Sequence, residues 1–281
     1  MGWLLPAGET LDADLALLQD LALLKDVARE AGELSLEWLR RGAKSWDKSA
    51  DNPVTEADIA VNDLIAKRLR SARPEYGWLS EETRDNPADR TQGKVWVVDP
   101  IDGTRAFVKG DTGFCVSIAR IDAGRPVAGV VYNPNFDELL HARVDGGAFL
   151  NDRPIRVTQA TTLACRMVGQ PEVFARRDAA ARWPGIELIT PMPNAMAWRL
   201  CLVAAGRWDA AVALNPKSDW DLAAAVLLVR EAGGIATDRE GKQLVFNQAS
   251  VLQRGVVAAG APLYPLIMEG LQNHLAGQDS R

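Results

Sequence analysis

Cysteine and histidine are scarce in this sequence of 281 residues, which contains three cysteines and two histidines. Cys115, Cys165 and Cys201 are widely spaced and odd in number, so they argue against a disulfide framework and indicate buried, reduced thiols. His141 and His274 stand in isolated positions. We therefore do not expect a zinc hydrolase or a histidine-based catalytic triad.

Long apolar runs and basic tracts are also missing. No uninterrupted apolar segment is long enough to span a bilayer, and the N-terminus lacks the positively charged start of an export signal. The formal net charge is −5 without a basic cluster, so neither nucleic acid nor a membrane is an expected partner. These absences predict a cytoplasmic globular protein that acts on a small molecule.

Hydrophobic periodicity predicts helices and strands along the whole chain. The expected helices cover residues 11–40, 55–71, 171–181, 194–205, 220–232 and 262–275. The expected strands cover residues 95–98, 114–121, 127–132, 139–144, 155–157, 167–168, 186–189, 210–214, 234–237 and 256–259. This pattern predicts an α+β domain with a mainly antiparallel sheet over residues 1–160. An α/β domain over residues 161–281 is expected to join it in one compact unit.

The motif D-P-I-D-G-T follows directly on an apolar strand and carries the densest chemistry of the chain. Its proline and glycine bend the backbone, so that Asp99 and Asp102 can face one cavity. With the carbonyl of Ile101 they offer three oxygens, the ligands that Mg2+ prefers. Gly103 and Thr104 are expected to begin a short helical turn whose N–H groups hold a phosphate. The chain has neither a G-x-x-x-x-G-K-[ST] loop nor a D-x-D-x-T motif, which argues against two other phosphate chemistries.

Together with three other segments, this motif resembles the inositol monophosphatase superfamily. The three are P-V-T-E-A-D at residues 53–58, G-W-L-S-E-E at 77–82, and W-D-L-A-A at 220–224 with R-E-A-G-G at 230–234. The four segments occur in the family's order across residues 50–240. The resemblance implies a layered αβαβα sandwich and a phosphomonoesterase that depends on two or three Mg2+ ions and is inhibited by Li+.

The resemblance also implies the metal ligands. Asp99 would bridge two ions, Glu81 and the Ile101 carbonyl would complete the first site, and Asp102 and Asp221 would complete the second. Asp99 and Asp221 each have an ordinary structural role as an alternative to metal binding. Asp99 could cap a turn after its strand, and Asp221 could cap the helix that begins near it.

Three further residues complete the implied catalytic centre. Thr104 would orient the attacking water while Glu81 accepts its proton, and Asp58 and Glu82 would lie behind the metal ligands. Thr104 could instead be an ordinary N-cap. Asp58 fits a capping box with Thr55 equally well.

The phosphate ester is less well defined by sequence. Inositol-specific relatives hold ring hydroxyls with a glutamate seven residues before the W-D aspartate, where this chain has Leu214. The resemblance therefore favours the bacterial 3'(2'),5'-bisphosphate nucleotidase branch and adenosine 3',5'-bisphosphate as substrate. Arg105, Arg199 and Lys217 are candidates for the second phosphate, or are surface cations.

Two alternatives to this substrate remain. The nearer one is an inositol-1-monophosphatase, and the more distant one is a non-catalytic binding or regulatory protein on the same fold. The family resemblance also implies a homodimer.

Overall fold

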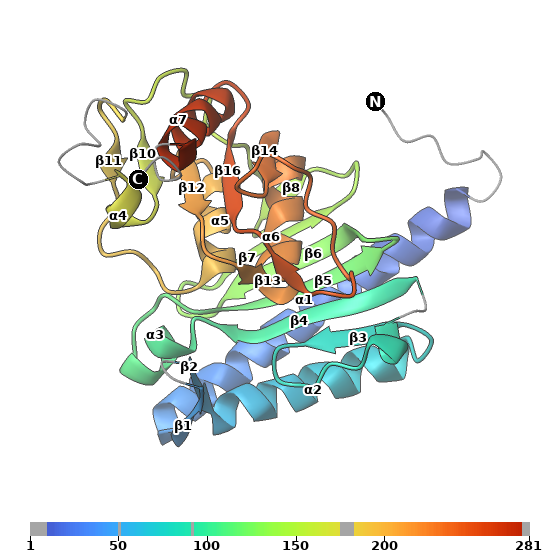
Figure 1. The fold of residues 1–281 in the computed structure, drawn as a ribbon. Helices are drawn as coiled ribbons and strands as arrows, with labels where there is room; N and C mark the ends of the chain where they lie inside the picture. Colours follow the sequence, from blue (N-terminus) through green and yellow to red (C-terminus); the bar gives the residue numbers. More distant parts are fainter. Residues whose placement is uncertain (1–9, 50–51, 91–92, 175–182, 277–281) are drawn as a thin grey trace.

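Five layers of secondary structure make up the molecule (Figure 1). The computed structural model describes residues 10–49, 52–90, 93–174 and 183–276. The main helices are α1 (Thr10–Arg41), α2 (Glu56–Ala72), α5 (Met196–Ala204), α6 (Asp219–Glu231) and α7 (Tyr264–Ala276). Helices α1 and α2 cover one face of a seven-stranded sheet, and α5 and α6 lie between that sheet and a five-stranded one. Helix α7 covers the outer face of the smaller sheet. This arrangement confirms the predicted αβαβα sandwich.

The larger sheet is a meander whose strand order follows the chain. Its strands are β3 (Gly77–Ser80), β4 (Lys94–Asp102), β5 (Cys115–Asp122), β6 (Arg125–Asn133), β7 (Glu138–Arg143), β8 (Ala148–Leu150) and β9 (Arg153–Pro154). All neighbours are antiparallel except β3 and β4, which are parallel. The prediction of a strand over residues 155–157 is wrong. There the chain leaves the sheet, and the N–H of Val157 donates to the carbonyl of Ala232 beyond α6.

The smaller sheet has the strand order β11-β10-β12-β16-β14 and mixed pairing. Its strands are β10 (Arg166–Val168), β11 (Glu187–Leu188), β12 (Ala210–Ala213), β14 (Gly234–Thr237) and β16 (Val256–Gly260). Strand β10 runs parallel to both neighbours, whereas β16 runs antiparallel to β12 and β14. Helix α4 (Pro171–Phe174) begins where the helix 171–181 was predicted, and the rest of that helix lies outside the described residues.

Short elements connect the helices and strands of these layers. They are the hairpin of β1 (Ser45–Ser49) with β2 (Asn52–Thr55), the 3-10 helix η1 (Pro87–Arg90), α3 (Thr104–Lys109), and the pair β13 (Lys217–Ser218) with β15 (Leu252–Gln253). Sequence periodicity did not predict β1, β2 or η1, which are too short and polar for a clear pattern.

The layers are held by apolar faces that alternate along the strands. Trp96 and Val98 of β4 pack toward α1 and α2, whereas Val95 and Val97 pack toward α5 and α6. Helix α6 is buried on all sides over residues 222–229, because it has a sheet on each side. The three cysteines are buried and free. Since α5 and α6 pack on both sheets, the halves 1–160 and 161–281 share one core, and the boundary between them stays a prediction.

Within the described residues, none of the helices combines the length and the apolar character needed to cross a bilayer.

Candidate active site

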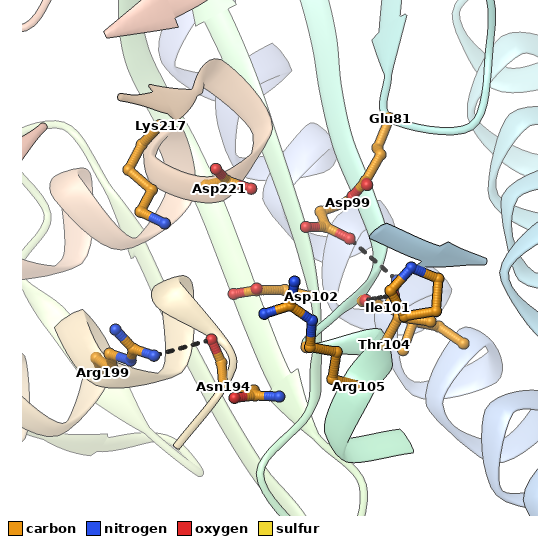
Figure 2. A pocket seen from close by; sticks show the side chains of 12 residues that line it. Glu81, Asp99, Ile101, Asp102, Thr104, Arg105, Asn194, Arg199, Lys217 and Asp221 are labelled. Carbon is orange, nitrogen blue, oxygen red and sulfur yellow. Dashed lines mark hydrogen bonds between the residues drawn. The ribbon is translucent and has the colours of Figure 1, made fainter. Parts of the chain in front are cut away.

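Three carboxylates from three elements converge at the end of the large sheet where β3 and β4 terminate (Figure 2). In the parallel pair, Ser80 lies opposite Val98, so the next residue, Glu81, arrives beside Asp99. The N–H of Glu81 continues the pairing and donates to the carbonyl of Val98 at 3.2 Å. Asp221 approaches from the first turn of α6. Ligand oxygens of Glu81, Asp99 and Asp221 lie within 4.8 Å of one another.

Asp99 is a buried acid whose main neighbouring charges are other carboxylates. Its side chain is 1% exposed, and Oδ1 accepts from the N–H of Ile101 at 3.1 Å. Its Oδ2 is buried and has no hydrogen-bond partner among the described residues. Burial raises the pKa of Asp99 well above its usual range, and the charges of Glu81 and Asp102 raise it further. The turn-capping alternative explains Oδ1 and leaves Oδ2 unexplained.

Asp221 has a structural and a site role at the same time. It is the third residue of α6 and not its N-cap, which is Ser218. Its Oδ2 accepts from the N–H of Ser218 at 2.9 Å in a capping box, while the carboxylate faces the cavity (Figure 2). Burial raises the pKa of Asp221, and the Ser218 N–H and the positive charge of Lys217 lower it. The N-cap alternative for Asp221 is thus corrected to a capping-box partner, and its role as a metal ligand stays a prediction.

The carboxylate of Asp102 binds backbone N–H groups at the N-terminus of α5. Its Oδ1 accepts from the N–H of Met196 at 3.0 Å and its Oδ2 from the N–H of Ala197 at 2.6 Å. Burial and then the charge of Asp221 raise the pKa of Asp102 to about 7, against the opposing effect of the two N–H groups and of Arg199. Asp102 is outside the three-carboxylate cluster. Its Oδ2 also accepts from Cys115 Sγ at 3.9 Å, and its role as a metal ligand stays a prediction.

Asp58 and Thr104 form a hydrogen-bonded pair beside the cluster. Asp58 Oδ2 accepts from the N–H and the hydroxyl of Thr55 at 2.8 and 2.6 Å, as the capping box predicted. Its Oδ1 lies 3.1 Å from Thr104 Oγ1, which also lies 3.2 Å from the carbonyl of Ile101. Asp58 therefore has the capping role weighed for it, and its place behind the metal ligands stays a prediction. The N-cap alternative for Thr104 is wrong, because Gly103 is the N-cap of α3.

Gly103 allows the D-P-I-D-G-T loop to approach the start of α5 closely. Its φ of 95° is left-handed, and a Cβ there would lie 3.0 Å from the Ala195 N and the Gly113 O. A larger residue would be strained by both the backbone angle and these contacts. The predicted phosphate contacts of Gly103 and Thr104 stay predictions.

The cluster opens into a cavity of about 230 Å³ that is lined by carboxylates and by cations (Figure 2). The cations are Arg105, Arg199 and Lys217. Arg199 is held in place because its Nε donates to the Pro193 carbonyl at 2.6 Å and its Nη2 to the Asn194 carbonyl at 3.2 Å.

Some cavity residues differ from the sequence prediction. Pro53 and Asn194 line the cavity and were not predicted, although Pro53 belongs to a matched family segment. Nothing in the sequence distinguished Asn194. Glu82, expected behind the metal ligands, does not line the cavity. Leu214 packs in the core between the small sheet and α7, so it neither binds nor excludes a ligand directly.

The donor set fits a hard divalent cation. Three carboxylates within 4.8 Å repel one another, and the unpartnered Oδ2 of Asp99 is an oxygen that a cation would satisfy. Oxygen-only donors suit Mg2+ or Mn2+ better than zinc. The acidic cluster can therefore hold a metal ion.

Comparisons with known proteins agree with this geometry. A family model described as "Inositol monophosphatase family" matches residues 17–276. An inositol-1-monophosphatase of Mesorhizobium japonicum is 38% identical over 216 residues, covering 73% of this chain and 79% of that protein. A histidinol-phosphatase of Chlorobaculum parvum is 34% identical over 226 residues, covering 79% and 86%.

A solved structure extends the similarity to the whole fold. The extragenic suppressor protein suhB of Bartonella henselae superposes with a TM-score of 0.77 at 32% identity, covering 92% of this chain and 98% of that one. The chain belongs to the inositol monophosphatase family and is a phosphomonoesterase.

Proposed function

We propose that this phosphatase is a Mg2+-dependent, Li+-sensitive enzyme that hydrolyses adenosine 3',5'-bisphosphate to AMP and phosphate. The observation that carries the metal-dependent chemistry is the convergence of Glu81, Asp99 and Asp221 around an unpartnered carboxylate oxygen. A binding protein gains nothing from assembling mutually repelling acids. This argues against the non-catalytic alternative.

Two or three Mg2+ ions would be held by the residues of this cluster. Glu81, Asp99 and the Ile101 carbonyl are the proposed ligands of one ion, and Asp99, Asp102 and Asp221 those of another. When bound, such ions neutralise the phosphate charge, lower the pKa of water and stabilise the leaving oxygen.

The protein's own groups would position the water and accept its proton. Thr104 can donate its proton to Asp58 or to the Ile101 carbonyl, which leaves its lone pairs to accept a hydrogen bond from water. Glu81 is the proposed base. The water oxygen bonds to phosphorus as the ester P–O bond breaks, and the departing alkoxide takes a proton from solvent. The N–H groups of Gly103 and Thr104 are the proposed phosphate donors.

The cations of the cavity support a substrate with a second anionic group. Arg105, Arg199 and Lys217 line the same cavity as the carboxylates, and a second phosphate would meet complementary charge there. Inositol 1-phosphate remains the alternative, which the name of the Mesorhizobium japonicum relative supports. Histidinol phosphate is a further candidate substrate, which the name of the Chlorobaculum parvum relative supports.

Phosphate release by the purified protein tests the proposal directly. With saturating Mg2+, adenosine 3',5'-bisphosphate should give a higher kcat/KM than inositol 1-phosphate or histidinol phosphate. EDTA should abolish turnover and LiCl should inhibit it. Faster turnover of inositol 1-phosphate would overturn the assignment of the substrate. Absence of turnover of all these esters with Mg2+ or Mn2+ would overturn the assignment of metal-dependent phosphatase activity. A cytoplasmic homodimer is part of the same proposal and is tested by light scattering and cell fractionation.

A further inference from the structure

A buried arginine connects two chain segments that each carry a carboxylate of the candidate metal site. Arg90 ends the 3-10 helix η1, and its side chain is 3% exposed. Its Nε and Nη2 donate to the two carboxylate oxygens of Asp85 at 2.7 and 2.8 Å. This is a bidentate pair, the strongest geometry available to these groups. Asp85 lies in the segment that leads from Glu81 to η1.

The remaining nitrogen of the same guanidinium reaches the second half of the chain. Nη1 donates to Asn247 Oδ1 and to the Gln248 carbonyl, both at 3.0 Å. Asn247 returns the contact, since its Nδ2 donates to the Arg90 carbonyl at 3.1 Å. The N–H of Asn247 then donates to Asp219 Oδ2 at 2.6 Å. Asp219 is the first residue of α6, and Asp221 follows two residues later.

Asn247 and Asp219, which continue the contacts of Arg90, are themselves tightly held. Asp219 is 0% exposed, and its Oδ1 accepts from Gln253 Nε2 at 2.7 Å. Asn247 has a φ of 56°, a left-handed conformation that asparagine tolerates better than most residues. None of Arg90, Asn247 or Asp219 lines the candidate active-site cavity. Any effect of these residues on the site must therefore act through the segments that they hold.

The carboxylate cluster needs such a link for an electrostatic reason. Glu81 lies beside Asp99 because β3 and β4 pair, whereas Asp221 arrives on a different element. Three carboxylates repel one another, and that repulsion tends to move the beginning of α6 away from the end of β3. A contact that ties both segments together opposes this separation.

We propose that Arg90 is a positioning residue, which holds Glu81 and Asp221 at metal-binding separation through Asp85 on one side and Asn247 with Asp219 on the other. The inference rests on the proposed function, because it concerns the metal site of that function. Residues that support metal ligands from behind typically change metal affinity by tenfold to a hundredfold.

Mn2+ binding to the full-length protein, measured by isothermal titration calorimetry without substrate, tests this inference. Arg90→Ala should raise the Mn2+ Kd about tenfold, at the lower end of the range for supporting residues. Asn247→Gly keeps the left-handed backbone accessible while it removes the side-chain contact with Arg90, and should raise the Kd several-fold. Arg90→Lys keeps the charge but cannot form the bidentate pair, so its Kd should lie between those of the wild type and Arg90→Ala.

Arg120→Ala is the matched control. Arg120 is also a buried arginine paired with an aspartate, since its Nη1 lies 2.9 Å from Asp20 Oδ2. It does not line the cavity. This variant should lower the Tm and leave the Mn2+ Kd within about twofold of the wild type.

Each outcome separates the inference from the proposed function. Wild-type Mn2+ affinity in both Arg90→Ala and Asn247→Gly, at a lowered Tm, would show that the link is only structural. Equal weakening by Arg120→Ala would trace the effect to lost stability and would also overturn the inference. Failure of the wild type to bind Mn2+ would instead overturn the proposed function. If Arg90→Ala does not fold, Asn247→Gly with the Arg120→Ala control decides alone.

Discussion

Asp20 and Asp99 are both aspartates with less than 2% exposure, yet their surroundings are opposite. Asp20, on α1, lies 2.8 Å from Arg73 Nε and 2.9 Å from Arg120 Nη1, and accepts the Tyr76 hydroxyl at 3.0 Å. Asp99, on β4, is surrounded by other carboxylates, and its Oδ2 has no partner among the described residues.

The difference teaches how a structural acid and a site for an external cation can be distinguished. A charge in the interior is tolerated only when an opposite charge compensates it. Around Asp20 the protein supplies that charge itself, so the cluster serves the packing of α1 on the large sheet. Around Asp99 the neighbouring charges are other carboxylates, an arrangement that a cation from solution would stabilise. The predictions below test this contrast, from the largest expected effect to the smallest.

Exchanging each aspartate for asparagine should separate the two sites most strongly. Asp99→Asn removes a proposed ligand, and phosphate release should fall by about a thousandfold or more, as expected when a metal's contribution of several kcal/mol is lost. The Tm of metal-free Asp99→Asn should equal or exceed that of the wild type, because one repelling charge is gone. Phosphate release and differential scanning fluorimetry in EDTA are the measurements.

Asp20→Asn is the control for that exchange. It leaves Arg73 without its anion and Arg120 with only Asp122, at 3.4 Å, which should cost about 3–5 kcal/mol of stability, while kcat of the folded protein stays unchanged. The contrast fails if Asp99→Asn keeps more than about a tenth of the wild-type rate, or if Asp20→Asn loses catalysis instead of stability.

Removal of the Thr104 hydroxyl should affect turnover without affecting metal binding. Thr104→Val keeps the shape but cannot orient water, so kcat should fall by about a hundredfold, the lower end for positioned proton-transfer groups. Its Mn2+ Kd should stay within about twofold of the wild type. Thr104→Ser, which keeps a hydroxyl near Asp58, should retain most activity. A parallel loss of Mn2+ affinity in Thr104→Val would contradict the role assigned to this residue.

The cations that line the cavity should influence substrate choice more than catalysis. At saturating Mg2+, Lys217→Met should raise the KM for adenosine 3',5'-bisphosphate about tenfold, equivalent to one charge-assisted contact of about 1.4 kcal/mol. The KM for inositol 1-phosphate should change less than about threefold. Lys217→Arg should restore much of the difference. Equal changes for both substrates would mean that Lys217 acts through Asp221 and not on a second phosphate.

The stability of the metal-free protein should fall as pH rises. The folded-state pKa of Asp102, about 7, lies above its ordinary 3.8, and those of Asp99 and Asp221 are also raised. The folded protein therefore binds more protons than the unfolded chain between about pH 4 and 7, and unfolding becomes easier across that interval. In EDTA, the Tm should be several degrees lower at pH 8 than at pH 5.

Metal addition provides the check on this pH effect. Mg2+ should raise the Tm more at pH 8 than at pH 5, because binding requires ionised carboxylates. Asp99→Asn should show a smaller fall in Tm between the two pH values. A Tm in EDTA that rises from pH 5 to pH 8 would argue against a cluster of mutually repelling carboxylates.

Much of the fold follows from patterns that are local in the sequence. The capping box of Thr55 with Asp58 predicted the beginning of α2, and alternating apolar residues predicted β4 to β7. The strand over 155–157 was wrong because an apolar triplet looks the same whether it pairs in a sheet or crosses between layers. The parallel pairing of β3 with β4 was not foreseen. It depends on contacts between segments that a local pattern does not connect.

The candidate site shows the same division. Resemblance to the family indicated Glu81, Asp99 and Asp221, and the structure brings these three together. Leu214 was taken as a missing hydroxyl ligand, whereas its side chain belongs to the core. Asn194 was missed because a single asparagine before a helix has many ordinary roles. The docking of α5 by Asp102 uses backbone N–H groups, which every residue type except proline provides.

By itself, the sequence determined which chemical groups are present: the D-P-I-D-G-T motif, the acidic residues at 81 and 221, and the apolar periods that form two sheets and their helices. Only the tertiary structure decided which buried acid lies against arginines and which lies among other acids. Whether Asp20 or Asp99 finds an arginine depends on segments up to a hundred residues apart in the chain, as with Arg120 and Asp20. Compensation of a buried charge is a property of distance in space, and packing sets that distance.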